Sequence, residues 1–203
     1  MKVFSYKLDH DYGLAPNPFG EYCTLAVCKS GIRSNKNLNI GDWITGTGSA
    51  KLNNLNHLVY AMKVEEKITF QEYWEDSRFQ YKKPKLNGSL VQLYGDNIYH
   101  QDKKSNSWIQ ENAAHSLDGG HTNQLHLDSD VGGKFVLISK EFYYFGDQHF
   151  LIPKRYWEIC SQGRNMMWRK IPEKVRTNFI QWLTQKYSIG IHGDPINWKE
   201  HLK

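Results

Sequence analysis

Residues 41–49, with the sequence GDWITGTGS, constrain the fold most, because an apolar run leads directly into a turn rich in glycine and hydroxyl groups. A second apolar run, 58–64, follows closely, and the two together predict strands of a buried sheet. Glycine lets a ligand approach the main chain. Trp43 adds a flat aromatic face, and Thr45, Thr47 and Ser49 add hydroxyl groups that donate or accept hydrogen bonds. The segment therefore predicts a pocket that stacks and hydrogen-bonds a planar ligand, although it identifies neither the ligand nor a reaction.

The length and composition predict one domain spanning residues 1–203. The chain has 203 residues, of which 39% are hydrophobic and 23% charged, as in an ordinary globular domain. The net charge of +5 permits a polyanionic partner but does not demand one. No apolar run approaches the ~20 residues needed to span a bilayer, and the first residues lack the apolar centre of a signal peptide. We therefore expect a cytoplasmic protein without a membrane partner.

Hydrophobic spacing predicts an α+β fold. The predicted fold is a small curved mixed β-sheet or a PUA-like β-barrel, with two or more flanking helices. Thr69 and Glu72 form a capping-box pattern at the start of a short helix. We expect extended structure within 79–93, a long polar loop over 95–133, an amphipathic C-terminal helix over 172–187 and a tail after it. Strands are predicted at 3–6, 22–28, 42–45, 58–64, 134–139 and 141–146.

The order of the motifs resembles PUA-like barrel domains, the group that includes the EVE, ASCH and YTH families, which place a Gly-Asp-aromatic strand after a basic-polar turn. More closely, the chain resembles the nucleotide modification-associated domain family of the second type. The resemblance implies an association with phage and bacterial systems that modify DNA bases, and it carries over no catalytic residues. Its motifs lie at 4–7, 11–18, 23–26, 41–49, 58–62, 73–74, 86–89, 94–100 and 145–146.

The glycine-rich turn fits neither common phosphate-binding fingerprint. Thr47 stands where a P-loop requires lysine, and Lys51 occupies the place of the third glycine in a dinucleotide-binding loop. In a regular strand, Trp43, Thr45 and Thr47 share one face and could line a pocket together. The alternative is that Trp43 fills the hydrophobic core.

The segment 94–102 gathers several chemically versatile side chains at the start of the polar loop. Asn97 and Tyr99 could hydrogen-bond a base, and Asp96 and His100 could act as general acid and base. The alternative is that Asp96 and Asn97 only cap a turn after Gly95.

The cysteines and histidines do not form a recognisable metal motif. His115, His121 and His126 alternate with aspartates at spacings that match no standard zinc site, so we predict no metal and no cofactor. Cys23 and Cys28 would point to opposite faces of a regular strand, and no neighbour in the sequence activates either thiol.

Basic residues provide a candidate nucleic-acid surface. Arg33, Arg164 and Arg169 could contact phosphates, or they could be solvated or cover the core. Helix 172–187 could dock a protein partner through its apolar stripe.

The function favoured by the sequence is a module that binds a nucleic acid or nucleotide and recognises a modified base. The ligand would contact Trp43, Thr45, Thr47, Ser49, Asn97 and Tyr99. The alternative is an enzyme that acts on a nucleotide or DNA base through Asp96 and His100, and the sequence does not decide whether the chain is an enzyme. A third alternative is a scaffold that docks through helix 172–187.

Overall fold

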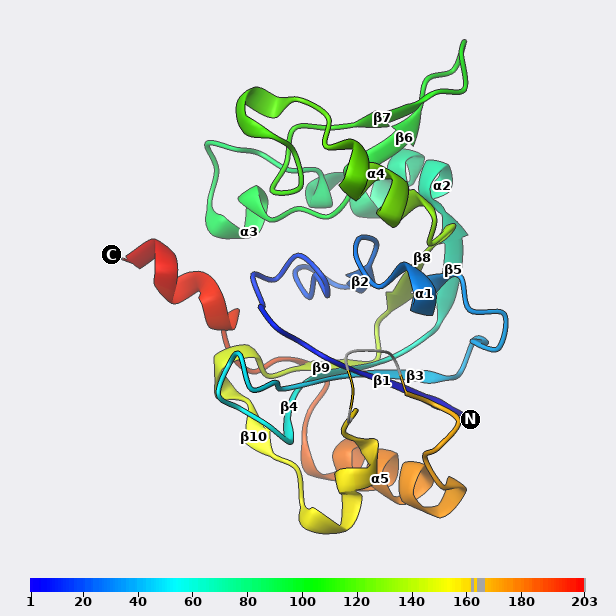
Figure 1. Ribbon diagram of the computed structural model, residues 1–203, viewed down its shortest axis with the longest axis vertical. Coiled ribbons are helices and arrows are strands. Elements are labelled where there is room, and N and C mark those ends of the chain that lie inside the picture. Colours follow the sequence, from blue (N-terminus) through cyan, green and yellow to red (C-terminus); the bar gives the residue numbers. More distant parts are fainter. Residues whose placement is uncertain (162, 164–166, 203) are drawn as a thin grey trace.

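The computed structural model describes residues 1–161, 163 and 167–202. The chain is a mixed α and β structure, which confirms the α+β prediction (Figure 1). The strands form three open sheets, and none closes into a barrel within the described residues, so the barrel alternative is wrong for this part of the chain. The strands are β1 (Val3–Lys7), β2 (Cys23–Leu25), β3 (Trp43–Thr47), β4 (His57–Lys63), β5 (Glu66–Thr69), β6 (Tyr99–Gln101), β7 (Trp108–Gln110), β8 (Phe135–Ser139), β9 (Phe142–Tyr144), β10 (Phe150–Leu151) and β11 (Gly190–Ile191).

The largest sheet has the order β1-β3-β4-β9-β11, with β10 also paired to β4. Strand β1 pairs with β3 in parallel, whereas β3 and β4 are antiparallel and shift register after Gly46. All five residues of β3 are buried, because core residues cover both faces of this strand. Ile44 belongs to the cluster on one face and Trp43 to the cluster on the other. Double coverage explains why the sequence of this strand does not alternate between apolar and polar residues.

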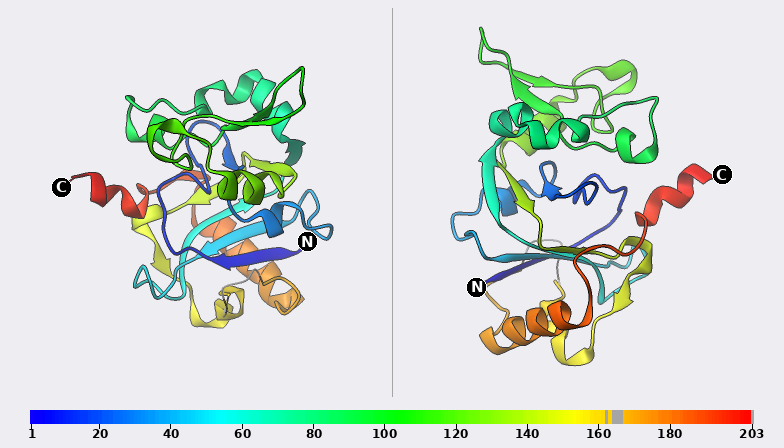
Figure 2. Two further views of the ribbon diagram at one scale, coloured as in Figure 1. Left: turned by 45° about the horizontal axis from the view of Figure 1, so that its top comes forward. Right: turned by 180° about the vertical axis from the view of Figure 1, so that it is seen from behind.

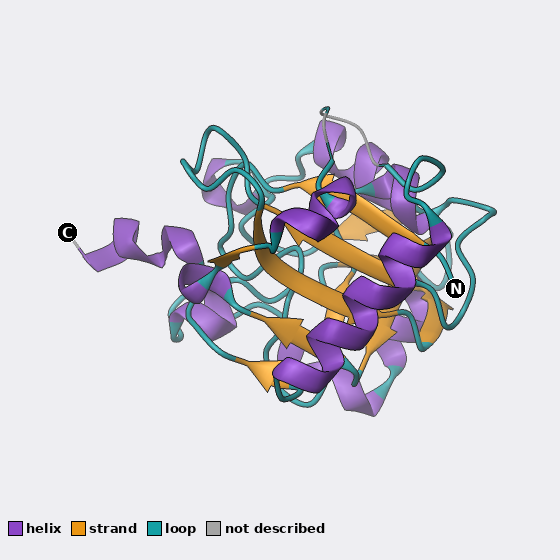
Figure 3. Cartoon of the chain, turned by 90° about the horizontal axis from the view of Figure 1, so that it is seen from below, coloured by secondary structure: helices purple, strands orange, loops and turns teal. Residues whose placement is uncertain are grey.

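Helix α5 (Glu173–Lys186) covers one face of the large sheet and crosses its strands (Figure 3). The predicted helix is confirmed, with Pro172 at its N-cap. Its apolar stripe buries Phe179, Ile180 and Leu183 against the sheet. Because that stripe is already packed, it is not a free surface for a protein partner.

The opposite side of the large sheet carries the two smaller sheets and the other α-helices, drawn in the upper part of Figure 1, whereas a 3-10 helix (Lys154–Ile159) packs beside α5. One sheet has the order β2-β8-β5, and the other is the hairpin β6-β7. The capping box of Thr69 and Glu72 is present and starts α2. The helices on this side are α1 (Ser30–Arg33), α2 (Phe70–Glu75), α3 (Leu90–Leu93) and α4 (Gln124–Val131).

The predictions for residues 79–93 and for the polar loop are wrong. Residues 79–93 are not extended, because a 3-10 helix (Ser77–Lys82) and α3 occupy this region. The long polar loop instead contains β6, β7, a 3-10 segment (Asp118–Gly120) and α4.

The C-terminal segment also has structure where a tail was predicted. A 3-10 helix spans Ile196–Leu202 and packs Trp198 against Phe19 with ring centroids 5.3 Å apart. It leaves the body of the molecule at one side, as the view from behind shows (Figure 2).

Candidate active site

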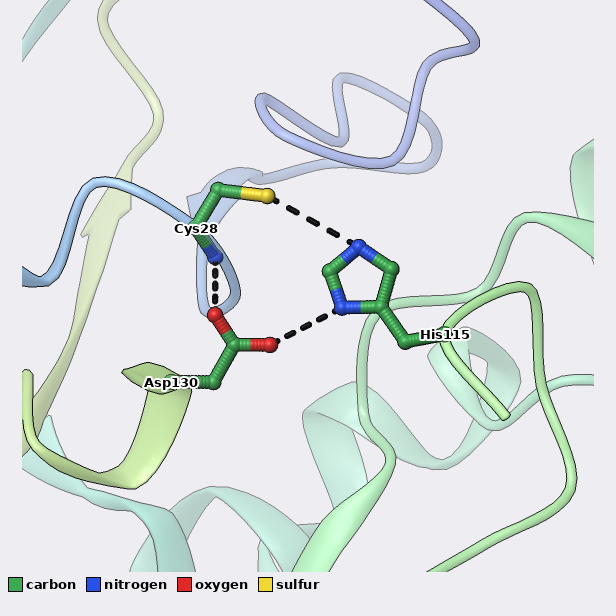
Figure 4. A group of neighbouring side chains, drawn as sticks. All are labelled: Cys28, His115 and Asp130. Atoms are coloured by element: carbon green, nitrogen blue, oxygen red, sulfur yellow. Dashed lines mark hydrogen bonds and ion pairs between the residues drawn. The ribbon is translucent and has the colours of Figure 1, made fainter. Parts of the chain in front are cut away.

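Three side chains from distant parts of the sequence, Cys28, His115 and Asp130, meet in one cluster (Figure 4). The sulfur of Cys28 lies 3.7 Å from Nε2 of His115. The other ring nitrogen of His115, Nδ1, lies 2.9 Å from Oδ2 of Asp130. A thiol, an imidazole and a carboxylate joined in this order form the arrangement by which a histidine activates a nucleophile and a carboxylate orients the histidine.

The backbone around Cys28 fixes the position of the thiol. Cys28 follows the end of β2 and precedes α1, and both Cys28 and Lys29 adopt the left-handed conformation, with φ of 55° and 43°. Such angles are unfavourable for residues with a side chain, so surrounding contacts must hold them. The backbone N–H of Cys28 donates to Oδ1 of Asp130, and its carbonyl oxygen accepts from Nε of Arg33 at 2.8 Å.

Asp130 is the hub of these contacts. It lies in the last turn of α4 and is only 2% exposed. Besides His115 and the Cys28 backbone, its carboxylate accepts a hydrogen bond of 2.9 Å from the hydroxyl of Tyr99. The buried guanidinium of Arg33 lies 3.8 Å from the same carboxylate. Because the carboxylate has several donors and a cation nearby, its charge is compensated although water is excluded.

The electrostatics of the cluster favour a protonated His115. Burial alone opposes the charged imidazolium, but hydrogen bonds to Asp130 and Cys28 outweigh it and raise the pKa of His115 to about 9. The neighbouring ring of His126, with its centroid 4.3 Å away, behaves in the opposite way. Burial, together with the charge of His115, lowers the pKa of His126. The pKa values of these two neighbouring rings are therefore shifted in opposite directions, upward for His115 and downward for His126.

The same three residues could in principle hold a metal ion. Their donor atoms lie within 4.8 Å of one another, and these residue types are common ligands. Figure 4 shows the imidazole ring beside the thiol and the carboxylate, with one ring nitrogen turned toward each. Because both ring nitrogens have a partner within the cluster, the placement also suits proton transfer among the three groups.

The cluster borders a cavity of about 570 Å³. Cys28, His115 and His126 lie in its wall beside the side chain of Lys29. Aliphatic residues and the rings of Tyr12 and Tyr94, which stack 5.2 Å apart, form other parts of the lining. A cavity of this volume with a few polar groups has the features of a small-molecule site.

The predicted ligand-binding residues of β3 do not line this cavity. Trp43 is 2% exposed and stacks on Tyr143 within the core. Thr45 and Thr47 are fully buried in the same strand, and Thr47 donates to the carbonyl oxygen of Tyr6. Ser49 is also buried. The physical reason is the coverage of β3 on both faces, which leaves this strand no open side.

Asp96 and Asn97 also lie in the interior. The Asp96 carboxylate accepts from the hydroxyls of Thr24 and Tyr73 at 2.6 and 2.7 Å. The Asn97 amide donates to the carbonyl oxygens of Tyr73 and Phe79. These contacts tie Asp96 and Asn97 to segments distant in the sequence, which is a different structural role from the turn cap given as the alternative.

His100 and Tyr99 contact other residues than Asp96 does. His100 pairs with Glu111 at 2.8 Å and stacks on Trp74 with ring centroids 4.0 Å apart. Tyr99 points to Asp130, and it is the predicted ligand-binding residue that the structure connects to the Cys28 cluster.

The basic residues expected to contact phosphates occupy different settings. Arg33 is fully buried beneath the cluster. Arg169 lies over the ring of Trp168 at 5.0 Å. Arg164 falls outside the described residues.

Cys28 and Asp130 are the functional candidates that sequence reasoning missed. Inspection of near neighbours found no activating group for Cys28, because its partners lie about a hundred residues further along the chain. A signal was nevertheless present, since His115 and Asp130 both belong to the polar segment whose length and composition predicted function.

The fold and the cluster define an α+β domain with a thiol–imidazole–carboxylate site beside a small-molecule cavity. A family model described as nucleotide modification associated domain 2 matches residues 1–202. The chain therefore belongs to this family, as the sequence motifs predicted, and the family name links it to nucleotide modification and to a nucleotide-related partner. Neither a curated protein nor a solved structure matched the chain. In the described part, no helix has the length and apolarity to cross a membrane.

Proposed function

We propose that the chain is an enzyme of nucleotide modification in which Cys28 is a covalent nucleophile. The single observation that carries the proposal is the cluster of Cys28, His115 and Asp130, with separations of 3.7 and 2.9 Å, whose cysteine and histidine line the cavity. The family membership supplies the substrate theme. In this proposal His115 is the general base and Asp130 holds its ring in place.

The proposed reaction is a substitution at an electrophilic carbon of a nucleotide or of a group attached to it. His115 keeps its Nδ1 proton in a hydrogen bond to Asp130 and takes the thiol proton at Nε2, which gives the imidazolium that its pKa of about 9 favours at neutral pH. The thiolate forms a bond to the carbon, and the leaving group takes the proton from Nε2. Water or a second nucleophile then transfers a proton to Nε2 and displaces the thiolate, which regenerates the site.

A pure binding module receives less support. The pocket predicted for a modified base required Trp43, Thr47 and Asn97 to face a ligand, and all three are buried in contacts with protein. An enzyme that uses Asp96 with His100 would need them to act together, but each is engaged by other partners. The proposed chemistry therefore centres on Cys28.

Selective alkylation with iodoacetamide tests the proposal without a known substrate. Burial raises the pKa of Cys23 and Cys160 to about 12, so neither thiol should react at neutral pH. Cys28 lines the cavity, and we expect one carbamidomethyl group per chain, located at Cys28 by peptide mass spectrometry. Cys28→Ser should abolish labelling, and the matched control Cys160→Ser should retain it.

The pH profile of this labelling separates an activated thiol from an accessible one. An ordinary thiol loses reactivity about tenfold for each pH unit below its pKa. We expect a shallower decline between about pH 8 and pH 6 in the native protein, because His115 takes up the thiol proton, and the ordinary steep decline in His115→Ala. Identical profiles for the two proteins would refute His115 as the base.

A further inference from the structure

We infer that the substrate is a free nucleoside monophosphate whose phosphate lies beside Lys51. The inference rests on the proposed function for its reactive end at Cys28, and it adds the substrate class and a phosphate subsite. The observation behind it is a second hollow that continues the cavity away from the cluster.

The second hollow has a volume of about 340 Å³. It shares Asp9, His10 and Tyr12 with the first cavity, so the two form one cleft with two limbs. Lys51 lines the second limb but not the first. A ligand that fills the cleft would thus have one end at the thiol and the other at a lysine.

The second limb is lined by one lysine, Lys51, and by the carboxylates of Asp9 and Glu200. Lys51 is exposed, and no hydrogen bond or ion pair of its ammonium group is found within the described residues. The ring of His10 lies in the shared wall, where it could donate to a phosphate oxygen. Glu200 also lines this limb, but its carboxylate accepts from the Tyr12 hydroxyl at 2.6 Å and the Asn197 amide at 2.8 Å. The Glu200 carboxylate therefore already has hydrogen-bond donors from the protein, whereas the ammonium group of Lys51 is available for a phosphate.

The shared wall between the limbs suits the sugar and base. Tyr12 stacks on Tyr94 there and adds an aromatic surface, and the Asp9 carboxylate can accept from a sugar hydroxyl or an exocyclic amine. Aromatic surface beside hydrogen-bonding groups is the combination that binds a nucleobase.

A single nucleotide fits this cleft better than a polymer does. Of the three arginines expected to contact a nucleic-acid backbone, Arg164 lies outside the described residues, and neither Arg33 nor Arg169 lines either limb. Arg33 is buried, and Arg169 packs on Trp168. These residues therefore do not extend the cleft into a basic track that could follow successive phosphates.

Calorimetric titration tests the phosphate subsite. The ligands are the deoxynucleoside monophosphates of the common bases, the matching nucleosides and a short single-stranded oligonucleotide. For the base that binds best, we expect the monophosphate to bind about tenfold more tightly than its nucleoside, because a charge-assisted contact is added. In Lys51→Gln this difference should largely vanish, whereas in the control Lys104→Gln, at an exposed position on the β6-β7 hairpin, it should persist.

Equal binding of monophosphate and nucleoside by the native protein would overturn the inference, as would an unchanged difference in Lys51→Gln. Tighter binding of the oligonucleotide than of any monophosphate would overturn it in favour of a polymer. Alkylation of Cys28 in Lys51→Gln distinguishes this failure from failure of the proposed function. If the pH dependence of Cys28 alkylation in Lys51→Gln matches that of the native protein, Cys28 is still supported as the nucleophile even when the phosphate subsite is refuted.

Discussion

Replacing Asp130 with Asn should destabilise the fold by about 3 kcal/mol. The Asp130 carboxylate accepts from the Cys28 backbone, the Tyr99 hydroxyl and His115, and it faces Arg33 at 3.8 Å. At 2% exposure, water cannot replace the lost interactions. Removal of one partner from a buried ion pair costs about 3–5 kcal/mol. The lower value is expected, because Arg33 also donates to three backbone carbonyl oxygens, which partly compensate its charge.

Urea unfolding measures this loss, provided that the free energy of unfolding falls with urea concentration at the same slope in the variant and in the native protein. A histidine titration by NMR gives a second readout, since the pKa of His115 should fall well below about 9 when the carboxylate is gone and burial remains. The control is Asp128→Asn on the same helix. The Asp128 side chain is exposed, and among the described contacts its carboxylate accepts a hydrogen bond only from Gln124. This variant should change the free energy of unfolding by less than about 0.5 kcal/mol. A loss below about 1 kcal/mol in Asp130→Asn, with an unchanged His115 pKa, would refute Asp130 as the hub.

Three further outcomes are expected. In Cys28→Ser, the free energy of unfolding should decline as pH rises above about 6.5, because Asp130 still holds a proton on folded His115 that the unfolded chain has released; urea midpoints as a function of pH measure it. Trp43→Ala should cost about 3–5 kcal/mol in urea unfolding through a core cavity, and normal alkylation of Cys28 in the folded variant would confirm that Trp43 is structural. Asp96→Asn should lower the melting temperature, since the carboxylate accepts two buried hydroxyl donors, while the labelling profile of Cys28 stays native; a lost profile in a folded variant would return Asp96 to the mechanism.

Local patterns in the sequence predicted much of the fold. Strand β3, strand β4 and helix α5 follow from runs and periodicities of apolar residues, and the capping box follows from the spacing of Thr69 and Glu72. Residues 79–93 were misassigned because their short helices depend on caps such as Ser89 and on packing, which outweigh local preference. Apolar runs and one capping box thus predicted β3, β4, α5 and α2, whereas a second capping box, at Ser89 and Gln92, was missed.

The candidate site depends almost entirely on distant contacts. Cys28 lies 87 positions from His115 and 102 from Asp130 in the sequence. The hydroxyl groups after Trp43 were conspicuous because they are neighbours in the sequence, but a strand covered on both faces keeps them inside. Chemically ordinary residues became a candidate site only through the folding of β2, α4 and the segment between β7 and α4 onto one another.

The same buried contacts also explain why Arg33 is not on a nucleic-acid surface. Its guanidinium donates to the carbonyl oxygens of Cys28, Phe135 and Asp130, and so it joins the two backbone segments that carry the thiol and the carboxylate. A β-carbon at position 133 would collide with this guanidinium, which accounts for Gly133 at the end of the turn that follows α4. Arg33 can therefore support the proposed chemistry without touching a substrate, because its hydrogen bonds fix the backbone of Cys28 relative to the backbone of Asp130.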